Sequence, residues 1–278
     1  MIRTSHEFLG DEVACSGPPR ACVVPVPIEL STSYIKGTGK APAALLNASR
    51  QIESYNPSVD IDLKGAGIVT LDGGLETKNE LIDFISSNRE TLASVFTCFL
   101  GGEHSITPWI LEAMDYGEIG IVWLDAHADL RREYLGDTES HACAARNSLS
   151  FGNIVEIGVR SYSIDEKRFI DESDDVEVFN RWGIDAKHAV EKLPARVYLS
   201  LDFDGIDPSV IRAVGTPEPG GLNWDDLIDI LSWLFSMKTV VGMDAVELCP
   251  VPNDDASDFI AARAVYEAIS RALAVEVK

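Results

Sequence analysis

The chain has 278 residues, of which 46% are hydrophobic and 24% are charged, as is usual for a globular protein. Its 45 acidic residues outnumber 23 basic ones, and a net charge of −22 argues by repulsion against nucleic acid or an anionic membrane as a partner. The five cysteines include no C-x-x-C pair, and no segment has the features of a signal peptide or a membrane span, so we expect a cytoplasmic protein.

Short apolar runs alternate with segments of helical period along most of the chain. The apolar runs predict strands at 21–28, 66–71, 94–102, 119–127, 154–160, 176–180, 195–204 and 239–248. The helical segments are 40–55, 77–95, 105–116, 164–173, 185–193, 223–237 and 257–275. This alternation predicts an α/β fold with a mostly parallel, eight-stranded sheet covered by helices on both faces. A closed barrel is the competing architecture, and the lack of a linker favours one domain over residues 1–278.

Four of the predicted strands end in side chains that commonly bind metals. These ends read GGEHS (101–105), DAHAD (125–129), SLDFDGIDP (200–208) and DAVELCP (244–250). In an open parallel sheet ligands bind beyond the carboxyl ends of the strands, so we expect these segments to meet there. Because strand side chains alternate between faces, an extended chain places Asp125, His127 and Asp129 on one side, and likewise Asp202 and Asp204.

Four carboxylates in a partly dry crevice repel one another and lose solvation unless cations lie among them. Two divalent ions that share these carboxylates remove that penalty. Carboxylate and imidazole ligands without thiolate favour Mn²⁺, with Zn²⁺, Co²⁺ or Ni²⁺ as alternatives. Three of the five histidines, His104, His127 and His141, fall at or just after these strand ends, which favours a metal site over unrelated turns and helix caps.

The ordered set of motifs resembles the ureohydrolase family, which comprises the arginases, the agmatinases and relatives and consists of binuclear manganese enzymes. The set is GGEHS, DAHAD, a histidine about a dozen residues later, SLDFDGIDP and the glutamate of VELCP. The resemblance spans about residues 21–275 and includes PIELSTSYIKGTGKAPAALLNAS, whereas residues 1–20 match poorly. It implies an arginase-like three-layer sandwich, two Mn²⁺ per chain, and a homo-oligomer, either a trimer or a hexamer.

The family pattern, carried over position by position, implies two sets of metal ligands. The first ion is held by His104, Asp125, Asp129 and Asp202. The second ion is held by Asp125, His127, Asp202 and Asp204. Asp125 and Asp202 therefore bridge the two ions, and a hydroxide between the ions is the nucleophile.

The same resemblance implies roles for three residues in catalysis. Asp129 orients the hydroxide, and His141 in SHACAARN protonates the leaving amine. Glu247 pairs with the substrate guanidinium through two charge-assisted hydrogen bonds. Attack on the guanidinium carbon then releases urea, and agmatine as the substrate leaves putrescine, a step in polyamine biosynthesis.

The segment LRREYLGDTESHACAARN (130–147) bears on the choice of guanidine. It lacks the N-T-P and S-G-N elements associated with arginine recognition and is similar to the shorter loop of agmatinases. Its acids Glu133, Asp137 and Glu139 suit the distal ammonium of agmatine, although simple solvation explains them nearly as well. Asp165 is a further candidate for contact with the far end of the substrate.

The sequence leaves other substrates and other protein classes open. Guanidinobutyrate, arginine or formiminoglutamate are alternative substrates, and a zinc-dependent deacetylase or a non-catalytic scaffold are alternative classes.

Two residues depart from the family pattern. Glu103 stands where Asp is frequent and is expected to alter the support of His104, and Ala142 stands where Gly is frequent and narrows the approach to the metals.

Overall fold

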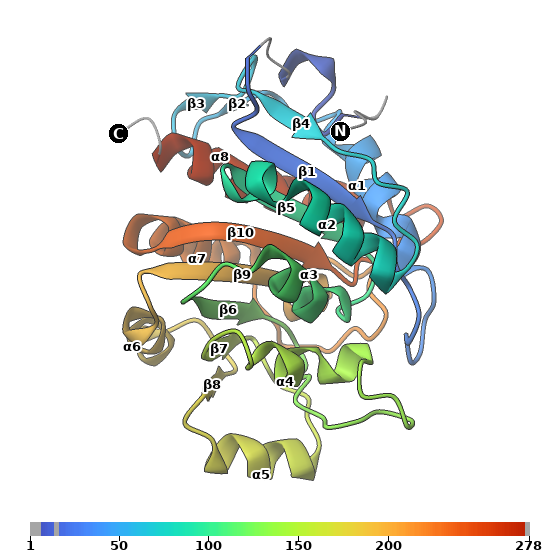
Figure 1. Cartoon of the computed structure of the whole chain (residues 1–278), viewed down its shortest axis with the longest axis vertical. Helices are drawn as coiled ribbons and strands as arrows, with labels where there is room; N and C mark the ends of the chain where they lie inside the picture. Colours follow the sequence, from blue (N-terminus) through green and yellow to red (C-terminus); the bar gives the residue numbers. More distant parts are fainter. Residues whose placement is uncertain (1–6, 14–16, 276–278) are drawn as a thin grey trace.

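An eight-stranded parallel sheet runs through the middle of the molecule in the computed structural model, which describes residues 7–13 and 17–275 (Figure 1). From edge to edge the strands are β4 (Ile68–Thr70), β1 (Ala21–Val26), β5 (Phe96–Gly101), β10 (Thr239–Val246), β9 (Arg196–Asp202), β6 (Gly120–Leu124), β7 (Ile154–Ile157) and β8 (Val176–Phe179). Each of these elements falls in a run predicted as a strand. The sheet has two free edges, so the predicted open sheet is confirmed and the closed barrel is wrong.

Helices cover both faces of the sheet. They are α1 (Ala41–Ser49), α2 (Lys78–Ala93), α3 (Ile106–Met114), α4 (Ala144–Ser148), α5 (Ile164–Glu172), α6 (Ile184–Lys192), α7 (Trp224–Met237) and α8 (Asp255–Val275). In Figure 1, α2, α3 and α4 lie on the near face, while α7 and α8 lie behind the sheet. The core accordingly consists of two apolar clusters, one on each face, which gives the predicted three layers. The short helix α4 was not predicted.

Burial on both sides explains why the strands read as unbroken apolar runs. Every residue of β5 and of β6 is buried. Along β5, Cys98 and Leu100 belong to the cluster that packs on α1, α7 and α8, while Phe99 between them belongs to the opposite cluster. Successive side chains therefore still point to opposite faces of the sheet, but both faces are buried, so apolar residues occupy both sets of positions.

Residues 7–13, which belong to the N-terminal segment that matches the family poorly, pack on the sheet. Phe8 and Val13 are fully buried, and Asp11–Val13 forms a 3₁₀ turn, η1. The Phe8 N–H donates to the Thr70 hydroxyl over 2.8 Å, and the Thr70 N–H donates to the Glu7 carboxylate over 2.6 Å. These bonds give the hydroxyl and the backbone N–H of Thr70, on the edge strand β4, hydrogen-bond partners. No helix in residues 7–13 and 17–275 is long and apolar enough to cross a membrane.

Candidate active site

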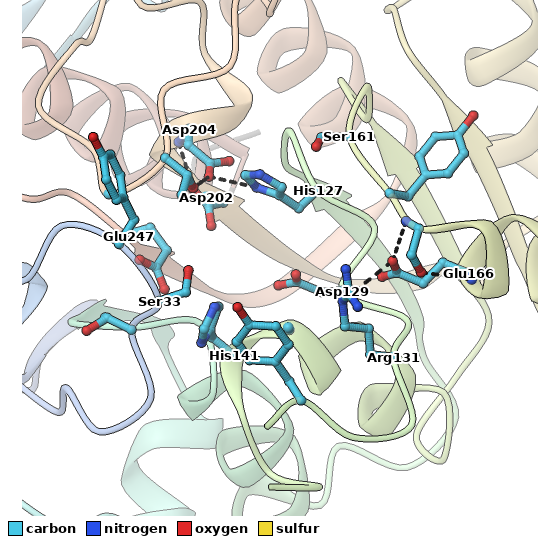
Figure 2. Close-up of a pocket in the computed structure, with 18 of the residues that line it drawn as sticks. Ser33, His127, Asp129, Arg131, His141, Ser161, Glu166, Asp202, Asp204 and Glu247 are labelled. Atoms are coloured by element: carbon cyan, nitrogen blue, oxygen red, sulfur yellow. Dashed lines mark hydrogen bonds and ion pairs between the residues drawn. The ribbon is translucent and has the colours of Figure 1, made fainter. Parts of the chain in front are cut away.

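The four motif-bearing strands β5, β6, β9 and β10 are neighbours in the sheet, and a cavity of about 260 Å³ opens where they end. Six of the predicted site residues line it: His127, Asp129, His141, Asp202, Asp204 and Glu247. His104 and Asp125 lie beside these residues and are fully buried. In Figure 2 the labelled acids and histidines gather around one hollow. The structure therefore brings together every predicted metal ligand.

Two groups of ligand atoms lie close enough to hold metal ions. One consists of His104, Asp125 and Asp202, and the other of Asp125, His127 and Asp204, with the ligand atoms of each group within 4.8 Å of one another. Asp125 belongs to both groups, as expected of a bridging ligand. Asp202, which the resemblance also makes a bridge, belongs only to the first group, with His104 and Asp125.

The buried ring nitrogen of His104 tests whether these residues fit a cation. Its Nδ1 lies 3.1 Å from carboxylate oxygens of both Asp125 and Asp202 and has no hydrogen-bond partner within the described residues. On the opposite side, Nε2 lies 2.8 Å from the Ser200 hydroxyl, which donates to Asp244 over 2.7 Å. Ser200 therefore accepts the Nε2 hydrogen and leaves a lone pair on Nδ1. This lone pair is repelled by ionised carboxylates unless a cation lies between them, so the donor set fits a metal.

The side chains behind the ligands hold them in place. Trp123 donates its indole N–H to Asp125 over 2.9 Å and stacks on the His104 ring with centroids 4.2 Å apart. The backbone N–H of Ala126 donates to Asp204 over 3.0 Å, and the Asp204 carboxylate lies 3.0 Å from His127 Nδ1. Such support fixes the orientation of ligands before an ion arrives.

Without a cation, ionisation of the carboxyl groups in this cluster is unfavourable. Burial, followed by the charge of Asp125, raises the pKa of Asp129 well above its ordinary value. Burial and the neighbouring Asp204 raise the pKa of Asp202 in the same way. Both carboxyls thus resist ionisation in the metal-free protein, and a bound cation removes that resistance.

The backbone places Asp129 by a turn and not by strand alternation. β6 ends at Leu124, and Asp129 has a φ of 49°, in the left-handed region that non-glycine residues seldom adopt. The expectation that an extended chain carries the motif to Asp129 is therefore wrong. Glu247 shares this feature with a φ of 63°. Unusual backbone conformations of this kind are concentrated at functional sites.

His141 and Glu247 face the cavity from different segments. His141 begins the 3₁₀ turn η3 (His141–Cys143), and burial lowers the pKa of its ring below the ordinary 6.5. Glu247 follows β10, and its Oε1 accepts the backbone N–H of His104 over 2.8 Å. Its Oε2 has no hydrogen bond within the described part of the chain, so it is free for a cationic ligand.

Asp165 and the loop acids lie outside this cavity. The Asp165 carboxylate pairs with Arg168 over 2.9 Å and is 84% exposed. Glu139 pairs with Lys78. None of Asp165, Glu133, Asp137 and Glu139 lines the hollow that holds the ligands.

Glu166 is the acid that sequence reasoning missed. Its carboxylate is buried, lines the cavity, and accepts the backbone N–H of Leu130 over 3.1 Å and of Ser163 over 2.7 Å. Figure 2 shows Glu166 on the opposite side of Asp129 from Glu247. The S-x-x-E pattern at Ser163 was the available signal, because it forms the capping box that starts α5 and turns Glu166 back toward the loop.

The Glu103 side chain, which was expected to alter the support of His104, makes its hydrogen bonds to other residues. Its buried carboxylate accepts hydrogen bonds from the backbone N–H groups of Leu30 and Ser31 and from the hydroxyls of Ser31 and Ser105. The longer side chain therefore anchors the segment after β1, and Ser31 in turn contacts His141.

Comparison with known proteins agrees with this site. A family model described as the arginase family matches residues 19–270. The chain is 34% identical over 273 residues to the N(1)-aminopropylagmatine ureohydrolase of Thermus thermophilus, covering 94% of this chain and 92% of that protein. It is 34% identical over 259 residues to the agmatinase of Pyrococcus horikoshii, covering 89% and 90%. The solved structure of the agmatine ureohydrolase of Thermoplasma volcanium has a TM-score of 0.84 at 31% identity, covering 99% of this chain and 97% of that one.

The open sheet and the acid-rich site at its edge define a hydrolase that acts on guanidino groups. The chain belongs to the arginase family and is an agmatinase-type ureohydrolase. The predicted family and the arginase-like fold are both confirmed.

Proposed function

We propose that the protein hydrolyses the guanidinium group of agmatine to urea and putrescine with two Mn²⁺ ions. One observation carries this proposal: two ligand groups that share Asp125 meet at the cavity that Glu247 and His141 also line. That combination supplies a place for a metal pair, an acceptor for a cation and a proton donor within one hollow. The three functions are those that guanidinium hydrolysis requires.

His104, Asp125, Asp129 and Asp202 would hold one ion, and Asp125, His127, Asp202 and Asp204 the other. When bound, the pair lowers the pKa of water towards neutrality and so supplies the nucleophile. A set of four carboxylates and two imidazoles without thiolate supports Mn²⁺. The chelated and reloaded protein, assayed with Mn²⁺, Zn²⁺ and Co²⁺ in turn, tests the choice of ion.

The chain's own side chains perform the rest of the reaction. Glu247 holds the guanidinium through Oε2, while its Oε1 stays bonded to the His104 backbone. Asp129 orients the attacking water by a hydrogen bond. His141 then gives a proton to the alkyl amine nitrogen as the C–N bond breaks, so the amine leaves as a neutral group and not as an anion.

The opposite end of the cavity supports a substrate that ends in an ammonium. Glu166 is buried there with two backbone N–H donors, so its carboxylate is held in place. Arg131 lies at the same end, with Nε 3.7 Å from Glu166. We propose that Glu166 binds the distal ammonium of agmatine, and that a substrate ending in a carboxylate meets the charge of Glu166 at this point.

N(1)-Aminopropylagmatine is the second candidate substrate. It has the same guanidinium and butyl chain as agmatine, and the Thermus thermophilus protein, at 34% identity over nearly the whole chain, carries its name. A panel of agmatine, N(1)-aminopropylagmatine, 4-guanidinobutyrate and arginine, with urea release as the readout, ranks the candidates. The proposal requires that a guanidine ending in an amine gives the highest kcat/KM.

A further inference from the structure

The hydroxyl of Ser31 lies between a buried carboxylate and the ring of His141. Ser31 Oγ is 2.9 Å from Glu103 Oε1 on one side and 3.0 Å from His141 Nδ1 on the other. The backbone N–H of His141 also donates to Ser31 Oγ over 3.0 Å. Three segments far apart in the sequence therefore meet at one oxygen atom.

Glu103 can only accept in this arrangement. Oε2 receives the N–H groups of Leu30 and Ser31 over 2.7 and 2.6 Å, and Oε1 receives the hydroxyl of Ser105 over 2.6 Å in addition to that of Ser31. Four donors converge on two fully buried oxygens. Since a serine hydroxyl has one hydrogen, and Glu103 takes it, the Ser31 oxygen is left with its lone pairs for His141.

We propose that Ser31 and Glu103 are positioning residues that hold His141 as the Nδ1–H tautomer. Ser31 Oγ accepts the backbone N–H and the Nδ1–H of the same histidine, which fixes both the place and the rotation of the ring. The lone pair of neutral His141 then lies on Nε2, which makes no hydrogen bond within the described residues. The effect of this fixed tautomer on catalysis rests on the function proposed above.

A fixed tautomer lets one atom both receive and deliver the proton. Neutral His141 takes a proton from solvent at Nε2 and becomes imidazolium. As the C–N bond breaks, Nε2 returns that proton to the amine nitrogen, and the ring is again neutral with its hydrogen on Nδ1. With the opposite tautomer the ring would turn its N–H to the cavity and its lone pair to Ser31, and the neutral ring could not take up a proton on the substrate side.

Ser140 offers the competing arrangement. Its hydroxyl is 3.3 Å from His141 Nδ1, and a hydrogen donated from it would place the lone pair on Nδ1. Ser31 is nearer, and its hydrogen is already directed to Glu103. A hydrogen bond to Ser31 therefore favours the Nδ1–H tautomer, whereas a hydrogen bond from Ser140 favours the Nε2–H tautomer. A ¹⁵N spectrum distinguishes the two.

The test is ¹⁵N NMR of the full chain with labelled histidine, loaded with diamagnetic Zn²⁺ because Mn²⁺ broadens the signals. The sequence has five histidines, and a spectrum of His141→Ala assigns the signals of His141. At pH 8 we expect a protonated Nδ1 and an unprotonated Nε2 in the natural protein. Ser31→Ala should lose this state, whereas Ser31→Thr and Ser140→Ala should keep it. A hydrogen on Nε2 in the natural protein, or a loss in Ser140→Ala with none in Ser31→Ala, overturns the proposal.

A kinetic measurement separates this inference from the proposed function. With agmatine, Ser31→Ala should lower kcat by about 10- to 100-fold with KM nearly unchanged, and Ser31→Thr should restore most of it. An unchanged kcat in Ser31→Ala contradicts the positioning role. If the natural protein releases no urea from any guanidine, the proposed function fails. The tautomer experiment then still decides where the hydrogen of His141 lies and whether Ser31 holds it there, because it needs no substrate.

Discussion

The carboxyl groups of Asp165 and Glu166 lie in different surroundings although the residues are consecutive. Asp165 is 84% exposed and pairs with Arg168, whereas Glu166 is 4% exposed and lines the cavity. The first turn of α5 separates them, because the capping box draws Glu166 back over Ser163. This difference makes the two residues a matched pair for testing substrate recognition.

Glu166→Gln should raise KM for agmatine by about 10- to 100-fold, because a hydrogen bond to a charged group contributes about 1.5–3 kcal/mol. The KM for ethylguanidine, which has no distal ammonium, should rise far less. Asp165→Asn is the control and should leave KM for both guanidines unchanged. Equal losses for agmatine and ethylguanidine in Glu166→Gln would show that Glu166 acts on the fold and not on the substrate.

Trp123→Phe should weaken metal binding while the fold persists. Phenylalanine keeps a ring against His104 but removes the N–H that holds Asp125. Loss of such a contact typically lowers metal affinity by about 10- to 100-fold. Titration of the chelated protein with Mn²⁺ measures this. Trp224→Phe, whose indole makes no hydrogen bond in the described residues, should bind like the natural protein, and equal affinity in both variants would contradict the role of Trp123.

Metal removal should change how stability depends on pH. In the metal-free folded protein the pKa values of Asp129 and Asp202 are raised, so above pH 3.8 the folded state holds more protons than the unfolded chain. Their contribution to stability is then present below pH 3.8 and is lost as the pH rises through the folded pKa values. Bound ions keep both groups ionised, so the stabilisation by Mn²⁺ should grow with pH.

Urea denaturation at several pH values, with EDTA or with saturating Mn²⁺, measures this difference in the free energy of unfolding. Asp202→Asn removes one of the two groups, and its metal-free form should show a smaller decline with rising pH. A stabilisation by Mn²⁺ that stays constant from pH 5 to pH 8 would mean that the buried carboxyls are already ionised without an ion.

Loss of the proton donor and loss of a shared ligand should have separable effects. His141→Ala should keep both metals, because no ligand group includes His141, and should lose about 100-fold or more in kcat. Asp125→Ala removes a member of both groups and should lose metal and activity together. Metal content by elemental analysis and urea release measure the two effects. Full turnover by His141→Ala would assign the proton to another group.

The sequence predicts the parts of this molecule that follow local rules. Apolar runs such as FTCFL in β5 must be buried on both faces, so their strands and the open parallel sheet follow from periodicity. The motifs at the strand ends also predict the metal ligands, because parallel strands carry their carboxyl ends to one edge. All six predicted ligands meet there.

What the sequence does not predict depends on contacts across the fold. Asp129 reaches the site through a left-handed turn, which alternation along a strand does not anticipate. Asp165 and Glu166 are consecutive acids, and the sequence does not show that hydrogen bonds from the backbones of Leu130 and Ser163 turn only Glu166 inward. Ser31 contacts Glu103 and His141, which lie 72 and 110 residues away from it in the sequence.

Urea release by the purified, Mn²⁺-loaded protein is the most direct test of the account. Agmatine, N(1)-aminopropylagmatine, 4-guanidinobutyrate and arginine are assayed in parallel, with EDTA-treated protein as the blank. We predict rapid, metal-dependent release from a guanidine that ends in an amine, with agmatine the best substrate, and little release from arginine. Preference for arginine or 4-guanidinobutyrate would contradict the role of Glu166, and no urea from any of them would contradict the proposed function itself.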